Sequence, residues 1–457
     1  MKENRLGYEP IPKLLVSMSL PIMGSMLIQA LYNIVDSIFV SRISEDALAA
    51  VSMAFPLQNL LISTAVGTAV GMNALLSRSL GQKKFEKANR TGEHGLILGI
   101  LTSFLFVLFG IFGTRFFYET QTNSEMIIQH GVEYLRIVSL FCVGIYIQIT
   151  SERLLQSTGK AFYSMITQSI GAIINIILDP ILIFGLLGFP KFGVAGAAYA
   201  TVIGQFCGAG TGIYLNHKVN HDIQLSFKGF QWDWKLIREM YAVGLPSILM
   251  MSIASFSTYF INKIVGVFTS TAVAAFGIFV KIQSFVLMPL FGMTNGIVSI
   301  IAYNYGAGKT DRLKETMRLG LVVGSIMTIT GCVVLLIGAP SILRAFDAGK
   351  EMMDIGLVAL RRISISFILA GASIVCSAIF QALGNGVLSM FISFVRQLIV
   401  LVPLAYLLSL THNLDAVWFA FPIAEVICLA LCIYFLKKVV KKEVDNNPNL
   451  KYEKVAE

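Results

Sequence analysis

The chain of 457 residues has few charged residues: they make up 13% of it, whereas 56% of the residues are hydrophobic. Soluble domains carry roughly twice that share of charge, so the composition excludes an ordinary soluble globular protein. Catalytic signatures are also missing, because the sequence contains no Walker loop, no Ser-His-Asp set and no zinc-ligand spacing. The sequence therefore favours a membrane protein that is not an enzyme, and we expect no cofactor.

Metal binding by thiols and nucleic-acid binding are not supported either. All six cysteines fall within apolar stretches, where packing is their expected role. The formal net charge is +9, but most Lys and Arg residues flank the apolar stretches. A basic bias of this kind indicates membrane topology, with cytoplasmic segments enriched in Lys and Arg. We expect no nucleic-acid partner, a lipid bilayer around the chain, and both termini in the cytoplasm.

Long apolar stretches recur along the chain, and each is long enough to cross a hydrocarbon core of about 30 Å as a helix. The sequence predicts an all-α integral membrane protein with twelve transmembrane helices. Their expected ranges are 14–40, 47–77, 91–117, 130–157, 163–187, 193–215, 238–266, 272–303, 315–339, 355–383, 388–410 and 415–437.

The second half of the chain repeats the first at an offset of 225 residues. Without gaps this offset pairs Pro21 with Pro246 and Gly71 with Gly296, among many other identities. Six helices per half is an even number, so the repeats are parallel and form two six-helix lobes. We predict an N-terminal lobe at 1–215, a cytoplasmic linker at 216–237, a C-terminal lobe at 238–440 and a polar cytoplasmic tail at 441–457.

Ionisable residues within the first lobe are few, and such residues are functional candidates because burying charge in a bilayer is costly. Asp36 lies in the first predicted helix; Asp179 lies in the fifth, with Asn175 one turn earlier on the same face. Thr201 falls at a similar depth in the sixth. These four residues can share a proton or surround Na⁺ with oxygen ligands. The plainer alternatives are that Asp36 caps a neighbouring helix and that Asp179 makes a structural hydrogen bond at the kink of Pro180.

The second lobe does not copy these acids, because Asp36 maps to Ile261 and Asp179 to Leu404. It carries Lys281, Arg396 and Glu425 instead. We expect these buried charges to pair with one another, since a buried charge needs a partner; a cationic pocket for an anionic substrate is the alternative.

Other polar residues lie near helix ends or within apolar stretches. We expect Glu93, His94, Glu152 and Arg153 to be interfacial, because they lie near predicted cytoplasmic helix ends. Amide and thioether side chains can line a substrate cavity or simply hold helices together. These cavity candidates are Gln29, Asn33, Gln58, Met251, Gln283 and Met288.

Four segments give the chain a resemblance to a known family. The runs NIVDSIFV, LGQKK, NIILDPILIFG and MPLFGMTNGIVSIIAYNYGAGK resemble the MATE (multidrug and toxin extrusion) transporters, over about residues 10–440. The resemblance implies a V of two six-helix lobes with a central cavity, in a bacterial plasma membrane. It also implies export of organic, mostly cationic or amphipathic drugs and toxins in exchange for H⁺ or Na⁺, and a monomer.

Residue by residue, the resemblance implies that Asp36 is the first-helix coupling acid. It likewise implies that Asn175 and Asp179 form the fifth-helix polar pair, that Thr201 is the sixth-helix hydroxyl and that Gln29 lies at the cavity. The acids that NorM-like members carry in the seventh and tenth helices have no counterpart here, which favours a DinF-like or MepA-like bacterial branch. A lipid-linked oligosaccharide flippase of the same superfamily, with Lys281 and Arg396 binding pyrophosphate, is the alternative function.

Overall fold

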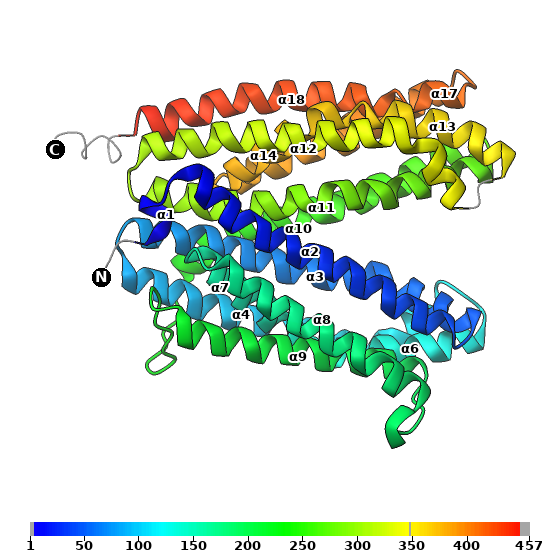
Figure 1. The fold of residues 1–457 in the computed structure, drawn as a ribbon, viewed down its shortest axis with the longest axis horizontal. Helices are drawn as coiled ribbons and strands as arrows, with labels where there is room; N and C mark the ends of the chain where they lie inside the picture. Colours follow the sequence, from blue (N-terminus) through cyan, green and yellow to red (C-terminus); the bar gives the residue numbers. More distant parts are fainter. Residues whose placement is uncertain (1–3, 347–348, 448–457) are drawn as a thin grey trace. The chain divides into compact units, whose positions relative to one another are not determined.

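The computed structural model describes residues 4–346 and 349–447, and all regular structure in this part of the chain is helical (Figure 1). Residues 448–457 of the predicted tail lie outside the described residues. The helices of the first half are α1 (Arg5–Tyr8), α2 (Ile11–Ser41), α3 (Glu45–Gly81), α4 (Phe85–Phe112), α5 (Thr114–Glu119), α6 (Glu125–Leu140), α7 (Val143–Ser157), α8 (Ala161–Phe184), the short 3₁₀ turn η1 (Leu186–Gly188) and α9 (Val194–Val219).

The second half repeats this order. Its helices are α10 (Trp234–Gly266), α11 (Ser270–Gly306), α12 (Thr310–Ala345), α13 (Lys350–Ser364), α14 (Phe367–Ala382), α15 (Gly386–Phe394), the π-helical η2 (Val395–Leu401), α16 (Val402–Ser409), α17 (Leu414–Val417), α18 (Ala420–Val439) and the π-helical η3 (Val440–Asp445).

Nine helical segments in the described ranges are long and apolar enough to cross a membrane, and two bent pairs raise this number to eleven. The bent pairs are α6 with α7 and α13 with α14, each bent by 48°. The twelfth predicted span is α9, a helix of 26 residues that is rich in Gly and Ala and falls outside the apolar set. The twelve-helix prediction is therefore confirmed as six long or bent helices in each half.

The chain folds into two compact units. Unit 1 holds the described residues up to Tyr8 and those at Leu20–Leu245; unit 2 holds Glu9–Ser19 and the described residues from Pro246 onward. In unit 1 the start of α10 lies against α3, because a Cβ on Gly71 would sit 2.2 Å from the Met240 carbonyl oxygen. In unit 2 the start of α2 lies against α11 at the equivalent Gly296. The predicted lobe boundaries of 215 and 238 remain predictions; α9 runs on to Val219.

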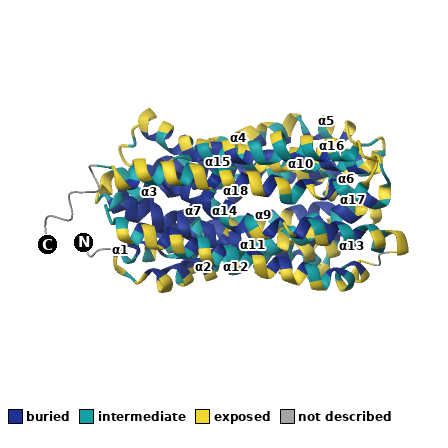
Figure 2. Ribbon diagram, turned by 90° about the horizontal axis from the view of Figure 1, so that it is seen from above, coloured by how far each residue is buried: buried dark blue, intermediate teal, exposed yellow. Residues whose placement is uncertain are grey.

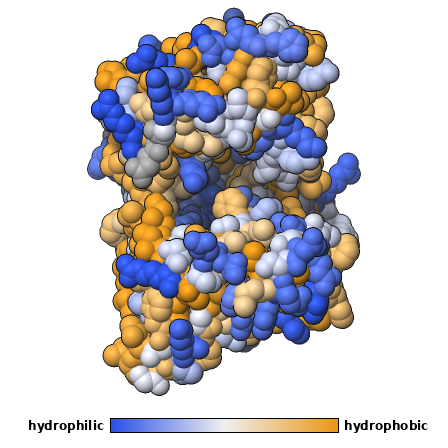
Figure 3. Space-filling model, turned by 90° about the vertical axis from the view of Figure 1, so that its right-hand side faces the viewer, coloured by the Kyte–Doolittle hydropathy of each residue, from blue (hydrophilic) through white to orange (hydrophobic). Residues whose placement is uncertain are grey.

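Each unit has its own apolar core, and apolar side chains also cover its outside. The core of unit 1 includes Val40 and Tyr118, and that of unit 2 includes Phe279 and Trp418. Many large apolar residues are exposed, for example Phe112 at 78%. Exposed positions recur along the outward sides of the helices (Figure 2). Lipid contact accounts for such exposure in a membrane protein. At the helix ends seen in Figure 3, hydrophilic residues are interspersed with hydrophobic ones.

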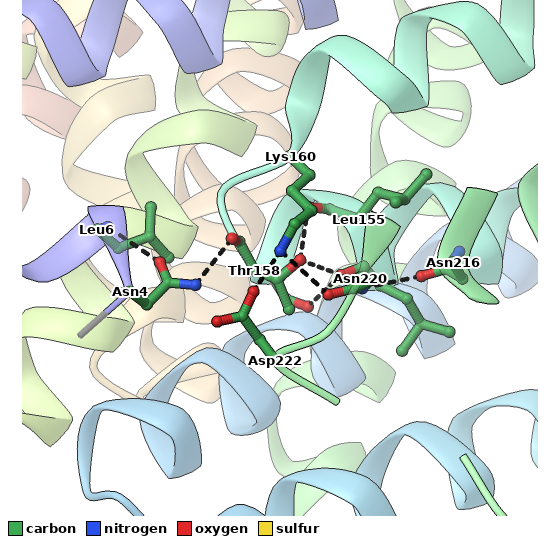
Figure 4. Close-up of polar contacts among 10 residues, drawn as sticks. Asn4, Leu6, Leu155, Thr158, Lys160, Asn216, Asn220 and Asp222 are labelled. Carbon is green, nitrogen blue, oxygen red and sulfur yellow. Dashed lines mark hydrogen bonds and ion pairs between the residues drawn. The ribbon is translucent and has the colours of Figure 1, made fainter. Parts of the chain in front are cut away.

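The connection between the halves lies on unit 1 and is held by polar contacts. Lys160 pairs with Asp222, and Asn220 donates to the Asn216 Oδ1 at 3.0 Å (Figure 4). Nearby, the Asn4 amide donates to the Thr158 carbonyl oxygen at 3.0 Å (Figure 4). These bonds fix the N-terminal segment and the connection to the turn between α7 and α8.

The same connection also contacts α4. His94 is fully buried; its Nε2 accepts from the Asp233 backbone N–H at 3.1 Å, and its ring lies 4.7 Å from that of Phe230. Glu93 accepts from the Ser226 N–H at 2.9 Å. Glu93 and His94 are thus buried beneath the connection, which a linear sequence does not bring back onto α4. Their expected place at the membrane interface remains a prediction.

Candidate functional site

Asp36 lies near the C-terminal end of α2, which continues through Pro21 without ending. Only 8% of Asp36 is exposed, and its Oδ1 has no hydrogen-bond partner among the described residues. If Asp36 capped a neighbouring helix, a backbone N–H of that helix would donate to its carboxylate. No donor reaches Oδ1 among the described residues. A buried carboxylate oxygen without a donor is costly unless it is protonated or meets a cation.

Asp179 lies on α8, directly before Pro180. It is fully buried, and neither carboxylate oxygen accepts a hydrogen bond from any residue that the structure describes. The alternative, a structural hydrogen bond from Asp179 at the kink of Pro180, is therefore not observed among the described residues. Asp36 and Asp179 are close enough to interact electrostatically. The two acids therefore form one buried site.

Asn175 and Thr201 join the two acids. The Asn175 Nδ2 donates to the Thr201 hydroxyl oxygen at 3.3 Å, whereas the Asn175 Oδ1 has no partner among the described residues. Asn175 is 2% exposed. Four acceptor oxygens on Asp36, Asn175 and Asp179 therefore lack a donor within the described ranges, and such a set can take up a proton or a hard cation.

Small residues at every fourth position of α9 let that helix approach α7 and α8. They are Gly196, Ala200, Gly204, Gly208 and Gly212. A Cβ on Gly204 would sit 2.6 Å from the Gly171 carbonyl oxygen and 3.2 Å from the Asn175 Cβ. Small residues at this spacing are typical of tightly packed membrane helices. The stripe therefore brings Thr201 within reach of Asn175.

Two tyrosines near the acids were missed from the sequence. Tyr32 interacts electrostatically with both Asp36 and Asp179, and Tyr134 interacts with Asp36. The signal for Tyr32 was available, because it precedes Asp36 by one helical turn on the same face. Tyr134 lies on α6, and no local pattern connects it with α2.

The predicted cavity residues occupy different surroundings. In unit 1, Gln58 Nε2 donates to the Tyr134 hydroxyl at 3.0 Å, Gln29 contacts Tyr32, and Asn33 is exposed. In unit 2, Gln283 and Met288 are half-buried on α11 and Met251 on α10 is 41% exposed. Gln58 and Gln29 thus adjoin the acid site through the tyrosines.

The second-lobe charges divide into a pair and a single lysine. Arg396 donates to Glu425 at 3.4 Å, so the expected pairing of these two charges is present; Glu425 is buried and Arg396 is half-buried. Lys281 is exposed rather than buried and has no ion pair with either residue, so the expected grouping of three is wrong for it. The long aliphatic stem of a lysine lets its ammonium group leave the helix interior. Arg396 lies in η2, a π-helical segment of the kind that often marks a special site.

Comparisons with known proteins agree with this architecture. The MatE family model matches residues 21–181 and again residues 246–407. The chain belongs to the MatE family. The two matches begin at the prolines that the internal repeat pairs, so the model recognises each half of this MatE chain separately and confirms the duplication.

Relatives of this MatE chain are named as exporters, not as enzymes. Multidrug export protein MepA of Staphylococcus haemolyticus is 25% identical over 441 residues, which cover 95% of this chain and 96% of MepA. The probable multidrug resistance protein YoeA of Bacillus subtilis is 28% identical, over 94% of this chain and 95% of YoeA. The sequence resemblance to MATE transporters is thus confirmed.

Solved structures share the fold of this MatE chain. An outward-facing multidrug resistance MATE family transporter of the MOP superfamily has a TM-score of 0.90 at 24% identity, and the match covers 97% of this chain and 99% of that one. A MOP superfamily transporter from Pyrococcus furiosus gives the same TM-score and coverage. The chain is therefore a multi-pass membrane protein with the duplicated helical fold of MATE transporters.

Proposed function

We propose that this MatE protein is a multidrug antiporter of a bacterial plasma membrane. It exports organic, mostly cationic or amphipathic compounds in exchange for H⁺ or Na⁺, as a monomer with both termini in the cytoplasm. The supporting observation is the buried site in unit 1, where Asp36 Oδ1 and both Asp179 carboxylate oxygens lack hydrogen-bond donors within the described ranges. The names of the MepA and YoeA relatives support drugs as the substrates.

The proposed cycle couples drug and ion through their different affinities for two conformations. Ion uptake by Asp36 and Asp179 from outside neutralises the pair and bends α2, which expels the drug. Release of the ion inward resets the protein. Coupling of this kind requires that ion and drug favour different states, because a ligand that binds both states equally shifts nothing.

Asp36→Asn tests this proposal, because Asn has nearly the same shape but can neither release a proton nor neutralise Na⁺. We expect the variant to reach the membrane and to lose efflux by on the order of 10²-fold. The measurement is ethidium transport by proteoliposomes under an imposed pH gradient and then under a Na⁺ gradient, which also decides between the two ions. Wild-type transport by Asp36→Asn under both gradients would refute the mechanism.

The flippase alternative requires basic groups free to bind pyrophosphate. Arg396 is occupied by Glu425, and the acid site of unit 1 would repel an anion. We therefore favour drug export.

A further inference from the structure

Glu152 on α7 is a third acid inside unit 1 that the proposed site does not include. It is half-buried in the structure. Its Oε1 accepts a hydrogen bond from the Gln148 Nε2 at 3.0 Å. The same Nε2 donates its other hydrogen to the Gln168 Oε1 on α8, also at 3.0 Å. Glu152 therefore belongs to a polar group that joins α7 to α8.

The neighbouring Arg153 interacts electrostatically with this acid but makes no ion pair with it. Arg153 is 8% exposed and donates from Nη1 to the Gln156 Oε1 at 3.0 Å. Gln156 in turn donates to the Ser164 hydroxyl at 3.2 Å. No residue in the described ranges makes an ion pair with Glu152. Its only hydrogen-bond donor among those residues is a neutral amide, so the carboxyl can accept and release a proton without breaking an ion pair.

Packing holds this group in place. A Cβ on Gly208 of α9 would sit 2.7 Å from the Gln148 Cδ and 2.9 Å from its Oε1. The amide is therefore confined between α9 and its two hydrogen-bond acceptors. The hydrogen bond between Gln148 and Glu152 is therefore held in a fixed position by the packing of α9.

The position of Glu152 links the acid pair to the end of the unit at Lys160. Gln168, which accepts from the same Gln148 amide as Glu152, lies on α8, the helix that also carries Asn175 and Asp179. Gln168 lies seven residues before Asn175 on α8, which corresponds to about 10 Å along the helix toward Lys160. Glu152 therefore lies on the side of the acid pair that we predict to be cytoplasmic.

We propose that Glu152 is a further proton-accepting residue of the transport cycle, on the inward route from the acid pair. This inference rests on the proposed function. When a protonated acid of the Asp36–Asp179 pair gives up its proton, an O–H bond breaks there, the proton passes through intervening water molecules, and an O–H bond forms on the Glu152 carboxylate. The aspartate becomes ionised and Glu152 neutral; Glu152 then releases the same proton to water at the Lys160 end. A proton fits better than Na⁺, because Glu152 offers too few free oxygens to surround a metal ion.

Glu152→Gln is the decisive variant, since glutamine keeps an oxygen for the Gln148 amide and nearly the same volume but cannot carry a proton. Proteoliposomes are assayed with ethidium in two ways: uptake driven by a pH gradient, and exchange of ethidium for ethidium without a gradient. Exchange needs the drug-loaded protein to change conformation but needs no net proton transfer. We expect exchange near the wild-type rate, and gradient-driven transport lower by on the order of 10²-fold.

Asp36→Asn is measured alongside to separate the two proposals. Gradient-driven transport at the wild-type rate in Glu152→Gln but not in Asp36→Asn would overturn the role of Glu152 and leave the proposed function standing. Equal loss of exchange and gradient-driven transport in Glu152→Gln would show a structural role and also overturn it. Wild-type transport by both variants would refute the proposed function itself.

A second variant covers the case in which Glu152→Gln does not fold. Glu152→Asp keeps a titratable carboxyl but moves it by one methylene group. We expect this variant to retain gradient-driven transport with an altered pH profile. A wild-type pH profile in Glu152→Asp would contradict the inference.

Discussion

Replacing Gly204 by alanine should separate α9 from α8, whereas the same replacement at Gly210 should not. The Gly204 Cβ would lie 2.6 Å from the Gly171 carbonyl oxygen, well inside ordinary contact. Because that oxygen belongs to a helix backbone, relief requires the two helices to move apart. At Gly210 on the same helix an added Cβ meets nothing within 4 Å. The two variants therefore form a matched pair.

The expected magnitude follows from two opposing effects. Gly→Ala raises helix propensity by about 1 kcal/mol at either position. Overpacking at Gly204 costs about 1–3 kcal/mol, which offsets or exceeds that gain. We thus expect Gly210→Ala to be more stable than Gly204→Ala by about 1–3 kcal/mol. Gly204→Ala should also lose the bond from Asn175 to Thr201, which is already 3.3 Å long, and transport should fall with it.

A thiol-reactive fluorescent dye measures this difference on protein in detergent. Five of the six cysteines are buried and none is in a disulfide, so unfolding exposes them to the dye. Melting temperatures are compared for the wild type and both variants, and ethidium transport is measured in parallel. Equal stability and transport in the two variants would refute the argument that the small-residue stripe of α9 builds the site.

Two further predictions concern other parts of the chain. Glu425→Gln should destabilise unit 2 by about 1.5–3 kcal/mol because it removes the charged partner of the half-buried Arg396, whereas the double variant Arg396→Met/Glu425→Leu should recover most of that loss in the same melting assay. Asp233 caps α10 by accepting from the Leu236 backbone N–H at 3.1 Å, which holds the pKa of its carboxyl below the usual range. The stability that the Asp233 cap contributes is therefore fully present above the pKa that an aspartate has in the unfolded chain. It is lost as the pH falls through the lower pKa of Asp233 in the folded protein. Asp233→Ala should cost about 1 kcal/mol at neutral pH and remove that acid dependence, measured by hydrogen exchange of residues 220–233.

Local pattern was enough to predict most of the fold. Hydrophobic length predicts the spans, and the offset of 225 residues predicts the two halves. It could not predict the 48° bends, because the residues between α6 and α7, Phe141 and Cys142, include no proline or glycine. A continuous apolar sequence is compatible with a straight helix and with a bent one. Packing against neighbouring helices determines which of the two forms.

The acid site could be predicted from the sequence only in part. Asp36 and Asp179 were recognisable because each is a lone carboxylate in an apolar helix. Glu152 was not recognised as part of a polar group, because its partners Gln148 and Gln168 come from two helices and only the fold brings them together. The position of Gln148 depends on α9 approaching α7, and the small residues between Gly196 and Gly212 were the available signal for that approach.

The acids of unit 1 have no counterparts at the equivalent positions of unit 2. The positions equivalent to Asp36 and Asp179 are Ile261, which is 1% exposed in the apolar core of unit 2, and Leu404, which packs against that core. The equivalents of Gln148, Glu152 and Gln168 are Ser373, Ser377 and Ser393, none of which can hold a charge at neutral pH.

Introducing both acids into unit 2 would place two carboxyl groups in a core of apolar side chains. The variant would lose apolar packing there and leave the carboxyl groups without hydrogen-bond donors. Ile261→Asp with Leu404→Asp should therefore destabilise unit 2 without adding an ion site. The coupling that we propose therefore uses the acids of unit 1 and needs no second carboxylate site.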